Sequence, residues 1–552
     1  MPILRTIITL ADRFLLVLLL LMLVFIYKVR IPVPVSPELA GKPMYKRIKV
    51  AENHYRIKNC WIRKNDHGVW EMYLEGSPYE RGLIYGILAR ETVISQEEAF
   101  TGQINELIPS VFMQHFLQGF IAWFNRDMDE YVPEENLQEI YGISRSFSDQ
   151  FNYIGPKFYR ILYYHAAHDI GHALADLRIV GCTSFAVKDG YTSDGKLLVG
   201  RNFDFYMGDE FARDKLLLFV KPDSGHAFTT YSWAGFTGVV SGMNDARITV
   251  TINASKSEIP LSAKTPISLL AREIVQYAGN IEEAVAIARK RKVFVSESIL
   301  IGSAKDHASV IIEKGPGKMD VYRNDKPLMV CSNHYQGAAF VNDTENRENI
   351  KFTDSAKRFQ RMKELIGEHY PLDPVSAAGI LRDRNGLGDQ PIGNGNPLAV
   401  NQLIAHHSII FQPEDGKFWI STGPWQLGEY LGYNLNSMIT AAQSGGVAII
   451  PADTFLNTTG YDRFLEFRSL KHRLVKSVLF QQDITLTQHE IDRFIASNPE
   501  SYEVYNNLGK YYQQKKMNKK ASEMYAKALK CEVASLAEQQ SILEALKQTR
   551  TL

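Results

Sequence analysis

The sequence is poor in cysteine and has no paired cysteines. Four occur among 552 residues, at positions 60, 182, 331 and 531, and none belongs to a C-x-x-C pair. A zinc ribbon or a dithiol redox motif is therefore not expected, and four scattered cysteines do not make a disulfide scaffold. A lone cysteine is most often a small buried hydrophobe. That interpretation is adopted for Cys60, Cys331 and Cys531.

An excess of either charge is also absent. Lys and Arg number 62 against 61 Asp and Glu, which gives a net charge of +1. No nucleic acid or polyanionic partner is expected from such a balance. The glycine-rich runs 386–388 and 393–395 lack the spacing of a phosphate loop and are interpreted as loops. No cofactor is predicted.

Metal-binding motifs are sparse. His165, His168 and His172 share one face of a predicted helix, a spacing that can hold zinc. No H-E-x-x-H motif accompanies them, and Asp169 is the nearest carboxylate. Histidines packed among aromatic residues or exposed to solvent are the favoured interpretation, and no metal site is predicted.

One long hydrophobic run is present, from Phe14 to Tyr27, with basic residues on both sides. It is shorter than the roughly 20 residues of a comfortable span. Long basic side chains at its ends could extend it to the membrane surface. No small-x-small cleavage site follows, so residues 1–30 are predicted to be an uncleaved signal anchor. The bulk of the protein is then expected on the extracytoplasmic side, which is the periplasm if the source is bacterial.

The remaining chain divides into segments that differ in proline content and in predicted secondary structure. Residues 31–50, rich in proline, predict an extended linker. Residues 51–181 open with a predicted strand pair over 61–74 and are otherwise mainly helical, forming a propeptide part and potential lid. Residues 182–455 predict strand blocks separated by helices at 266–277, 355–366 and 374–381. Such an order favours an α+β fold in which helices cover sheets.

The tail, residues 456–552, is predicted to be helical. Its aromatic, Leu-Gly and Ala-x-x-x-Tyr spacing over about 498–531 resembles one tetratricopeptide repeat (TPR). Small residues at Gly509 and Ala521 would let two antiparallel helices pack closely. One repeat cannot bury its own face, so it is expected to pack on the main domain or on a protein partner. A helical hairpin with no binding role is the alternative.

Cys182 differs from the other cysteines in its surroundings. It follows Gly181, and Arg201 and Asp204 come one predicted hairpin later. Cleavage of the Gly181–Cys182 bond would give the cysteine a free α-amine of pKa about 7.7–8. That amine could accept the thiol proton, so that the thiol acts as a nucleophile without a separate histidine.

Cys182-Thr183 followed by Gly-Arg201-Asn-x-Asp204 resembles the start of the mature N-terminal nucleophile (Ntn) hydrolases, which include the bile-salt hydrolases. The preceding Gly181 and the upstream motif over 76–82 are more similar to the acyl-CoA:6-aminopenicillanic acid acyltransferase branch, also called peptidase C45. Members of that branch cleave themselves at a Gly-Cys bond. The resemblance covers residues about 70–425 and implies a four-layer αββα core.

The resemblance also implies roles for individual residues. Cys182 would be the nucleophile, Arg201 would support it, and Asp204 would orient its amine. Asn253 and Asn333 lie where the family has its two asparagines, the first of them in the oxyanion hole. Arg358 matches the segment that supplies a late active-site arginine.

The function predicted from these residues is a membrane-anchored Ntn hydrolase or N-acyltransferase that cuts amide bonds through a thioester on Cys182. Its expected substrates are acylated amines or N-acyl amino acids, with acyl-CoA or another acyl donor as a further expected partner. Two alternatives stay open. One is a non-catalytic membrane scaffold that binds partners through the TPR-like tail. The other is an unprocessed thiol hydrolase pairing Cys182 with His406 or His407.

Overall fold

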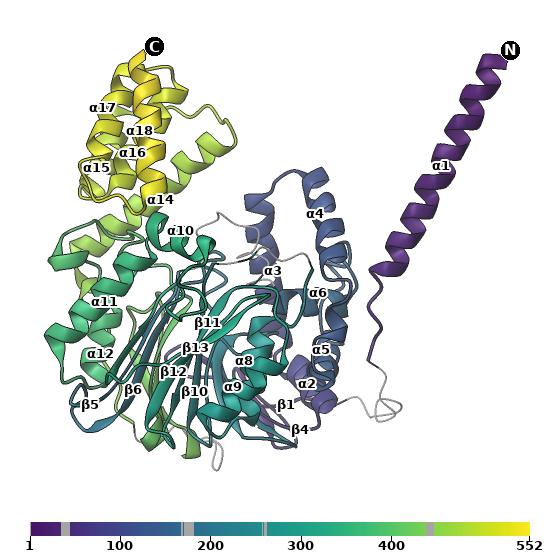
Figure 1. The fold of residues 1–552 in the computed structure, drawn as a ribbon, viewed down its shortest axis with the longest axis vertical. Helices are drawn as coiled ribbons and strands as arrows, with labels where there is room; N and C mark the ends of the chain where they lie inside the picture. Colours follow the sequence, from purple (N-terminus) through teal and green to yellow (C-terminus); the bar gives the residue numbers. More distant parts are fainter. Residues whose placement is uncertain are drawn as a thin grey trace.

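The computed structural model describes residues 2–34, 45–166, 169, 181–256, 258, 262–437 and 447–551. Two β-sheets stacked face to face form its centre, and helices cover both outer faces (Figure 1). The predicted mixed α/β architecture is confirmed, and the layers follow the order helix, sheet, sheet, helix.

The larger sheet is antiparallel except where β4 pairs in parallel with β7. In spatial order its strands are β1 (Ile48–Ala51), β2 (His54–Ile57), β3 (Cys60–Lys64), β4 (Trp70–Gly76), β7 (Lys215–Pro222), β8 (Phe228–Trp233), β9 (Ser241–Asn244), β10 (Ile248–Ala254), β11 (Glu297–Ser303), β12 (Ala308–Lys314) and β13 (Met319–Tyr322).

The smaller sheet is antiparallel throughout. Its strands, in spatial order, are β14 (Leu328–Cys331), β5 (Thr183–Asp189), β6 (Gly195–Phe203), β15 (His407–Gln412), β16 (Lys417–Ser421) and β17 (Tyr430–Asn434). The predicted hairpin around residues 192–195 is therefore β5–β6. It places the start of β5, next to Cys182, beside the end of β6.

Alternating side chains of the central strands enter two different cores. On β7, Leu217 and Phe219 point to the smaller sheet and pack with Leu197 and Val199. Their neighbours Leu216 and Leu218 point the other way, into the helices. Because both faces are covered, these strands read as continuous apolar runs in the sequence.

Helices from both halves of the chain cover the larger sheet. They are α2 (Pro78–Leu88), α3 (Arg90–Leu107), α5 (Glu134–Ser144), α6 (Lys157–His165), α8 (Ile267–Tyr277) and α9 (Ile281–Lys290), with α4 (Val111–Phe124) after α3. The smaller sheet is covered by α11 (Ser355–His369) and α12 (Pro374–Leu381), which follow α10 (Thr344–Phe352).

Gly82 of the 76–82 motif allows two helices to pack closely. A Cβ on Gly82 of α2 would lie 1.9 Å from the carbonyl oxygen of Glu139 on α5. In the same contact, Arg81 donates from Nη2 to Oε2 of Glu139 at 2.7 Å, and both side chains are buried. The motif thus fixes α2 against α5.

The first half of the chain is part of the larger sheet and not a separate layer. The predicted strand pair over 61–74 is present as β3 and β4, and β4 pairs with β7 from Trp70 to Gly76. The sequence pattern over 51–181 predicts a mainly helical propeptide part. The structure shows that this part also contributes β2, β3 and β4 to the larger sheet.

The N-terminal helix α1 runs from Pro2 to Lys28. From Phe14 to Tyr27 its large apolar side chains are exposed, except that of Phe25, whose ring stacks on Trp123 of α4. Within the part of the chain that the structure describes, no single helix meets a length and hydropathy test for a membrane span. The bent pair Arg90–Leu107 and Val111–Glu130 meets it together.

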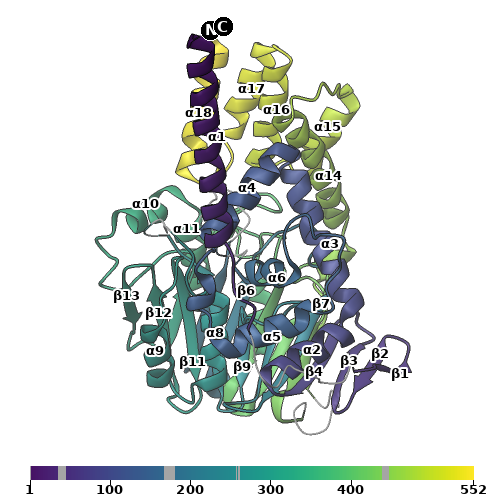
Figure 2. The ribbon, with the colours of Figure 1, turned by 90° about the vertical axis from the view of Figure 1, so that its right-hand side faces the viewer.

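The tail is a bundle of five helices at one end of the layered core (Figures 1 and 2). They are α14 (Thr459–Leu479), α15 (Gln488–Ser497), α16 (Tyr502–Gln514), α17 (Asn518–Ala528) and α18 (Leu536–Thr551). A Cβ on Gly509 would lie 2.6 Å from the Tyr525 ring, so the small residue lets α16 approach α17. The bundle packs on Leu398, Leu403 and Trp425, so it covers the main domain.

Candidate active site

Cys182 lies immediately before β5 and is fully buried. Its Sγ accepts a hydrogen bond from Nη2 of Arg201 at 3.5 Å. Burial raises the pKa of the thiol, while Arg201 opposes this and Asp204 raises it further. The thiol is therefore neutral near pH 7 in the uncleaved chain, and it must lose its proton as the sulfur attacks a carbonyl.

Arg201 is held rigidly on β6. Its Nη1 donates to the carbonyl oxygen of Val240 at 2.9 Å and to Oγ of Ser241 at 2.6 Å. Its Nη2 also donates to the carbonyl oxygen of Ile252. The guanidinium carbon lies 4.2 Å from the centre of the Phe203 ring. These contacts aim a fixed positive charge at the sulfur.

Asp204 lies one residue beyond β6 and is fully buried. Its backbone oxygen accepts from the Gly181 amide at 3.0 Å, which brings the chain before Cys182 against it. Burial raises the pKa of its carboxyl to about 8, although Arg358 and Arg201 lower it. Among the described residues, Oδ1 has no hydrogen-bond partner. One carboxyl oxygen thus stands free beside the predicted cleavage site.

Arg358, on α11, bonds both the segment of Cys182 and the segment of Asn333. Its Nη1 donates to the carbonyl oxygen of Cys182 at 2.9 Å and to Oγ1 of Thr183 at 2.9 Å. Its Nη2 donates to Oδ1 of Asn333 at 2.7 Å. The sequence prediction placed these residues in one site, and the structure brings them into direct contact.

Asn253 lies near the end of β10 on the facing sheet. Its Oδ1 accepts from Oγ of Ser184 at 3.1 Å, and its Nδ2 donates to the carbonyl oxygen of Cys331 at 3.3 Å. Asn333, just after β14, donates from Nδ2 to the carbonyl oxygen of Ala254 at 2.8 Å. Both asparagines therefore border the start of β5, and their hydrogen bonds within the described ranges do not reach the sulfur.

His406 and His407, the histidines considered as partners of Cys182, make no hydrogen bond to its sulfur among the described residues. Nδ1 of His406 and Nδ1 of His407 lie 2.9 Å apart, and Nε2 of His407 lies 2.9 Å from Oγ of Ser241. Burial lowers the pKa of both imidazoles well below the usual range. Side-chain hydrogen bonds link His407 to Cys182 through Ser241 and Arg201. This geometry does not favour the Cys-His alternative.

Sequence reasoning did not identify Gln402, which lies in the loop before β15 and is buried. Its Nε2 lies 3.3 Å from the carbonyl oxygen of Gly181 and 3.2 Å from Oδ2 of Asp204. No local motif marks a glutamine in a loop as functional. Only the fold brings position 402 next to position 181.

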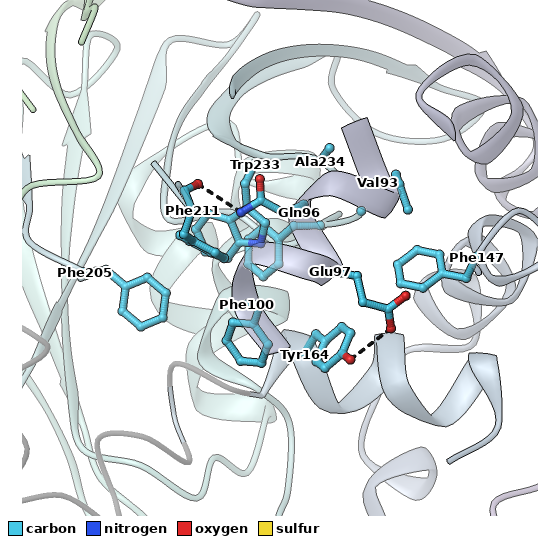
Figure 3. A pocket seen from close by; sticks show the side chains of 12 residues that line it. Val93, Gln96, Glu97, Phe100, Phe147, Tyr164, Phe205, Phe211, Trp233 and Ala234 are labelled. Atoms are coloured by element: carbon cyan, nitrogen blue, oxygen red, sulfur yellow. Dashed lines mark hydrogen bonds between the residues drawn. The ribbon is translucent and has the colours of Figure 1, made fainter. Parts of the chain in front are cut away.

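An aromatic cavity lies near the site (Figure 3). The Phe203 ring that supports Arg201 lies 5.7 Å from the Phe205 ring, and Phe205 lines the cavity with Phe211 and Trp233. Helix α3 closes its other side through Phe100. Its volume of about 30 Å³ holds one water molecule but no acyl chain. Acyl binding there would require the aromatic side chains to move.

The predicted histidine cluster is only partly described. His165 is buried, its Nδ1 bonds the carbonyl oxygen of Ile161 at 2.8 Å, and its ring stacks on Phe236. Burial lowers its pKa to about 4. His168 and His172 lie outside the described residues. Among the residues that the structure describes, no group of three potential ligands is arranged for a metal.

Residues 191–424 match the profile of the acyl-coenzyme A:6-aminopenicillanic acid acyl-transferase family. The predicted family resemblance is confirmed. The match begins just after β5 and covers β6, β15 and the segments that supply Asn253, Asn333 and Arg358.

Curated relatives extend this similarity. An uncharacterized protein of Archaeoglobus fulgidus is 27% identical over 367 residues, covering 59% of this chain and 59% of that protein. An N-acylethanolamine-hydrolyzing acid amidase of Caenorhabditis elegans is 26% identical, covering 45% of this chain and 69% of the amidase. The chain thus spans about three fifths of the length of the first relative.

Two solved structures are similar as well. The Caenorhabditis elegans acid amidase has 19% identity and a TM-score of 0.31, covering 42% of this chain and 93% of that one. A mutant conjugated bile acid hydrolase from Clostridium perfringens has 12% identity and a TM-score of 0.32, covering 49% and 95%.

Proposed function

We propose that this protein is a cysteine Ntn enzyme that cleaves its own Gly181–Cys182 bond and then acts on amide bonds. The observation that carries this proposal is the convergence on Cys182. Arg201 contacts its sulfur, Arg358 contacts its carbonyl oxygen, and the free Oδ1 of Asp204 lies beside the preceding glycine. These are the contacts that an N-terminal nucleophile needs once its amine is released.

Cleavage would supply the base that the buried thiol lacks. The new α-amine would form next to the Asp204 carboxyl, which can accept a hydrogen bond and hold the amine near the sulfur. The amine would take the thiol proton as sulfur attacks a substrate carbonyl, and the acyl group would then pass to Cys182 as a thioester. Water would resolve the thioester in a hydrolase, and an amine acceptor in a transferase.

In this proposal Arg201 stabilises the thiolate by its positive charge. Asn253, on the facing sheet, is the candidate donor to the substrate oxyanion. Asn333 and Arg358 hold the backbone of Cys182 in place. Asp204 is a positioning residue, since it acts through the amine.

The two chains produced by cleavage would stay together. Pairing of β4 with β7 runs from Trp70 to Gly76, and the core between sheet and helices mixes residues from both chains. The anchor would therefore retain the catalytic chain although the covalent link is cut. We propose that α1, whose apolar side chains from Phe14 onward are exposed, anchors the protein in a membrane with its bulk on the extracytoplasmic side.

Acylated amines are the proposed substrates. The name of the Caenorhabditis elegans relative gives N-acylethanolamines as what that protein hydrolyses. The aromatic cavity lined by Phe205, Phe211 and Trp233 is the proposed acyl site after opening.

Intact mass measurement and N-terminal sequencing test the proposal. Wild-type protein should yield a fragment that begins at Cys182, and Cys182→Ala should remain whole. Cys60→Ala, which removes another buried thiol, is the matched control and should be cleaved normally. An intact wild-type chain after purification from cells and incubation would refute self-cleavage.

Activity is then measured on N-acylethanolamines and N-acyl amino acids, with and without an added amine acceptor. Acyl-amide product in the presence of acceptor identifies a transferase, and free acid identifies a hydrolase. Alkaline carbonate extraction of membranes tests the anchor: removal of residues 1–30 should release the protein, and retention of the truncated form would contradict the assignment.

A further inference from the structure

Gln402 touches the bond that self-cleavage would break. Its Nε2 lies 3.3 Å from the carbonyl oxygen of Gly181, the atom on which negative charge collects when that carbonyl is attacked. The amide also bonds Oδ2 of Asp204 at 3.2 Å, so the two contacts fix its orientation. The side chain is 5% exposed, and little water competes for its protons.

Gly181 leaves room for this contact. A Cβ at position 181 would lie 2.7 Å from Nε2 of Gln402, closer than ordinary packing allows. A glycine before the cysteine therefore lets the glutamine amide approach the backbone. This gives a steric reason for glycine at the predicted cleavage site.

The loop that carries Gln402 is held on both sides. The Asn401 amide donates to the carbonyl oxygen of Asp383 at 2.8 Å, and the Leu403 amide donates to Oδ1 of Asn401 at 2.9 Å. Leu403 has a φ of 55°, a left-handed conformation that is costly for a leucine. Its side chain is fixed in the core shared with the tail. A strained but firmly packed backbone thus places the glutamine.

We propose that Gln402 is the oxyanion donor for self-cleavage, an inference that rests on the proposed cleavage at Gly181–Cys182. The Cys182 sulfur attacks the Gly181 carbonyl carbon, and Nε2 of Gln402 donates to the oxygen as it becomes negative. The peptide C–N bond then breaks, the nitrogen takes the thiol proton, and Gly181 is left as a thioester on Cys182. Water hydrolyses this thioester, which frees the Gly181 carboxylate and restores the thiol.

The test follows the rate at which freshly synthesised precursor is converted to the fragment that begins at Cys182. Gln402→Leu puts a shorter apolar side chain in place of the amide and so removes the donor. It should slow cleavage by about 10²–10³-fold. Gln426→Leu is the matched control. It removes another buried glutamine, whose Nε2 bonds the carbonyl oxygen of Leu381 at 3.4 Å, and it should cleave at the wild-type rate.

A second variant separates a chemical role from a structural one. In Gln402→Glu the side chain keeps its size but can donate only when it is protonated. Its cleavage rate relative to wild type should therefore rise as pH falls from 8 to 5. A rate ratio that is constant with pH would overturn the inference, and this readout serves even if the leucine variant does not fold.

The outcomes distinguish this inference from the proposed function. If the wild type yields no fragment beginning at Cys182, self-cleavage itself fails. If the wild type is cleaved and Gln402→Leu is cleaved within about threefold of its rate, only the role of Gln402 fails. Gln402→Leu and Gln426→Leu are also made in the Cys182→Ala background, in which the chain stays whole. Their melting temperatures should match that of Cys182→Ala alone.

Discussion

The buried carboxyl of Asp204 should make the uncleaved precursor less stable as pH rises. Burial raises the pKa of this carboxyl from 3.8 to about 8 in the folded chain. Arg358 and Arg201 face it and lower the value, and Asp354 raises it. Between these two pKa values the unfolded chain loses the proton while the folded chain keeps it. A rise in pH therefore favours unfolding over this window.

The size of the effect follows from the two pKa values. Each pH unit inside the window reduces the free energy of unfolding by about 1.4 kcal/mol. The stabilisation is complete below pH 3.8 and is lost as pH rises to about 8. From pH 5 to pH 8 the contribution of Asp204 should thus change by about 4 kcal/mol.

Urea unfolding of the Cys182→Ala precursor at pH 5, 6, 7 and 8 measures this change. Asp204→Asn in the same background removes the titration and keeps the size of the side chain. Subtracting one pH profile from the other removes the contributions of all other titratable groups to the free energy of unfolding. A difference that varies by less than about 1 kcal/mol over this range would refute the reasoning.

Three further outcomes are expected. Asn253→Ala in the mature enzyme should reduce kcat by about 10²–10³-fold in amide-hydrolysis assays with little change in KM, because it removes the proposed oxyanion donor; an unchanged kcat would reject that role. Arg201→Met should raise the pKa of the nucleophilic thiol, seen as an upward shift in the pH profile of alkylation of the mature enzyme; an unshifted profile would show that its charge does not act on the sulfur. Gly82→Ala should lower the free energy of unfolding by at least about 1–3 kcal/mol, because its Cβ would overlap the backbone of Glu139. Its control, Gly102→Ala on α3, meets no atom within 4 Å and should be neutral or stabilising in urea unfolding; equal losses in both would contradict the packing argument.

Local sequence was enough to predict most strands and helices of the core. The hairpin formed by β5 and β6 has an Asp-Gly turn between apolar runs, and such a turn specifies pairing over a few residues. The helices α8 and α11 show their apolar periodicity directly. The tail was also predicted as helical, with Gly509 at a close helix contact.

Long-range pairing was not predictable in this way. The parallel contact of β4 with β7 joins residues that lie 146 positions apart, and nothing in either segment marks its partner. The sequence therefore predicted the strand pair over 61–74 but not the partner strand that joins it to the larger sheet. From sequence, the tail could pack either on the main domain or on a protein partner. In the structure it packs on the main domain, at the loop that precedes β15.

The sequence by itself determined the candidate nucleophile, the Gly181–Cys182 bond and the order of Arg201, Asp204 and the later polar residues, because these follow from residue types and spacing. The tertiary structure decided which of them touch. It set Arg201 against the sulfur and brought Gln402 to the Gly181 carbonyl. It also left one oxygen of Asp204 without a hydrogen-bond partner among the described residues. Contacts of this kind depend on chain segments up to 221 residues apart. The pairing of β5 with β6 and of β6 with β15 in the smaller sheet brings these segments together.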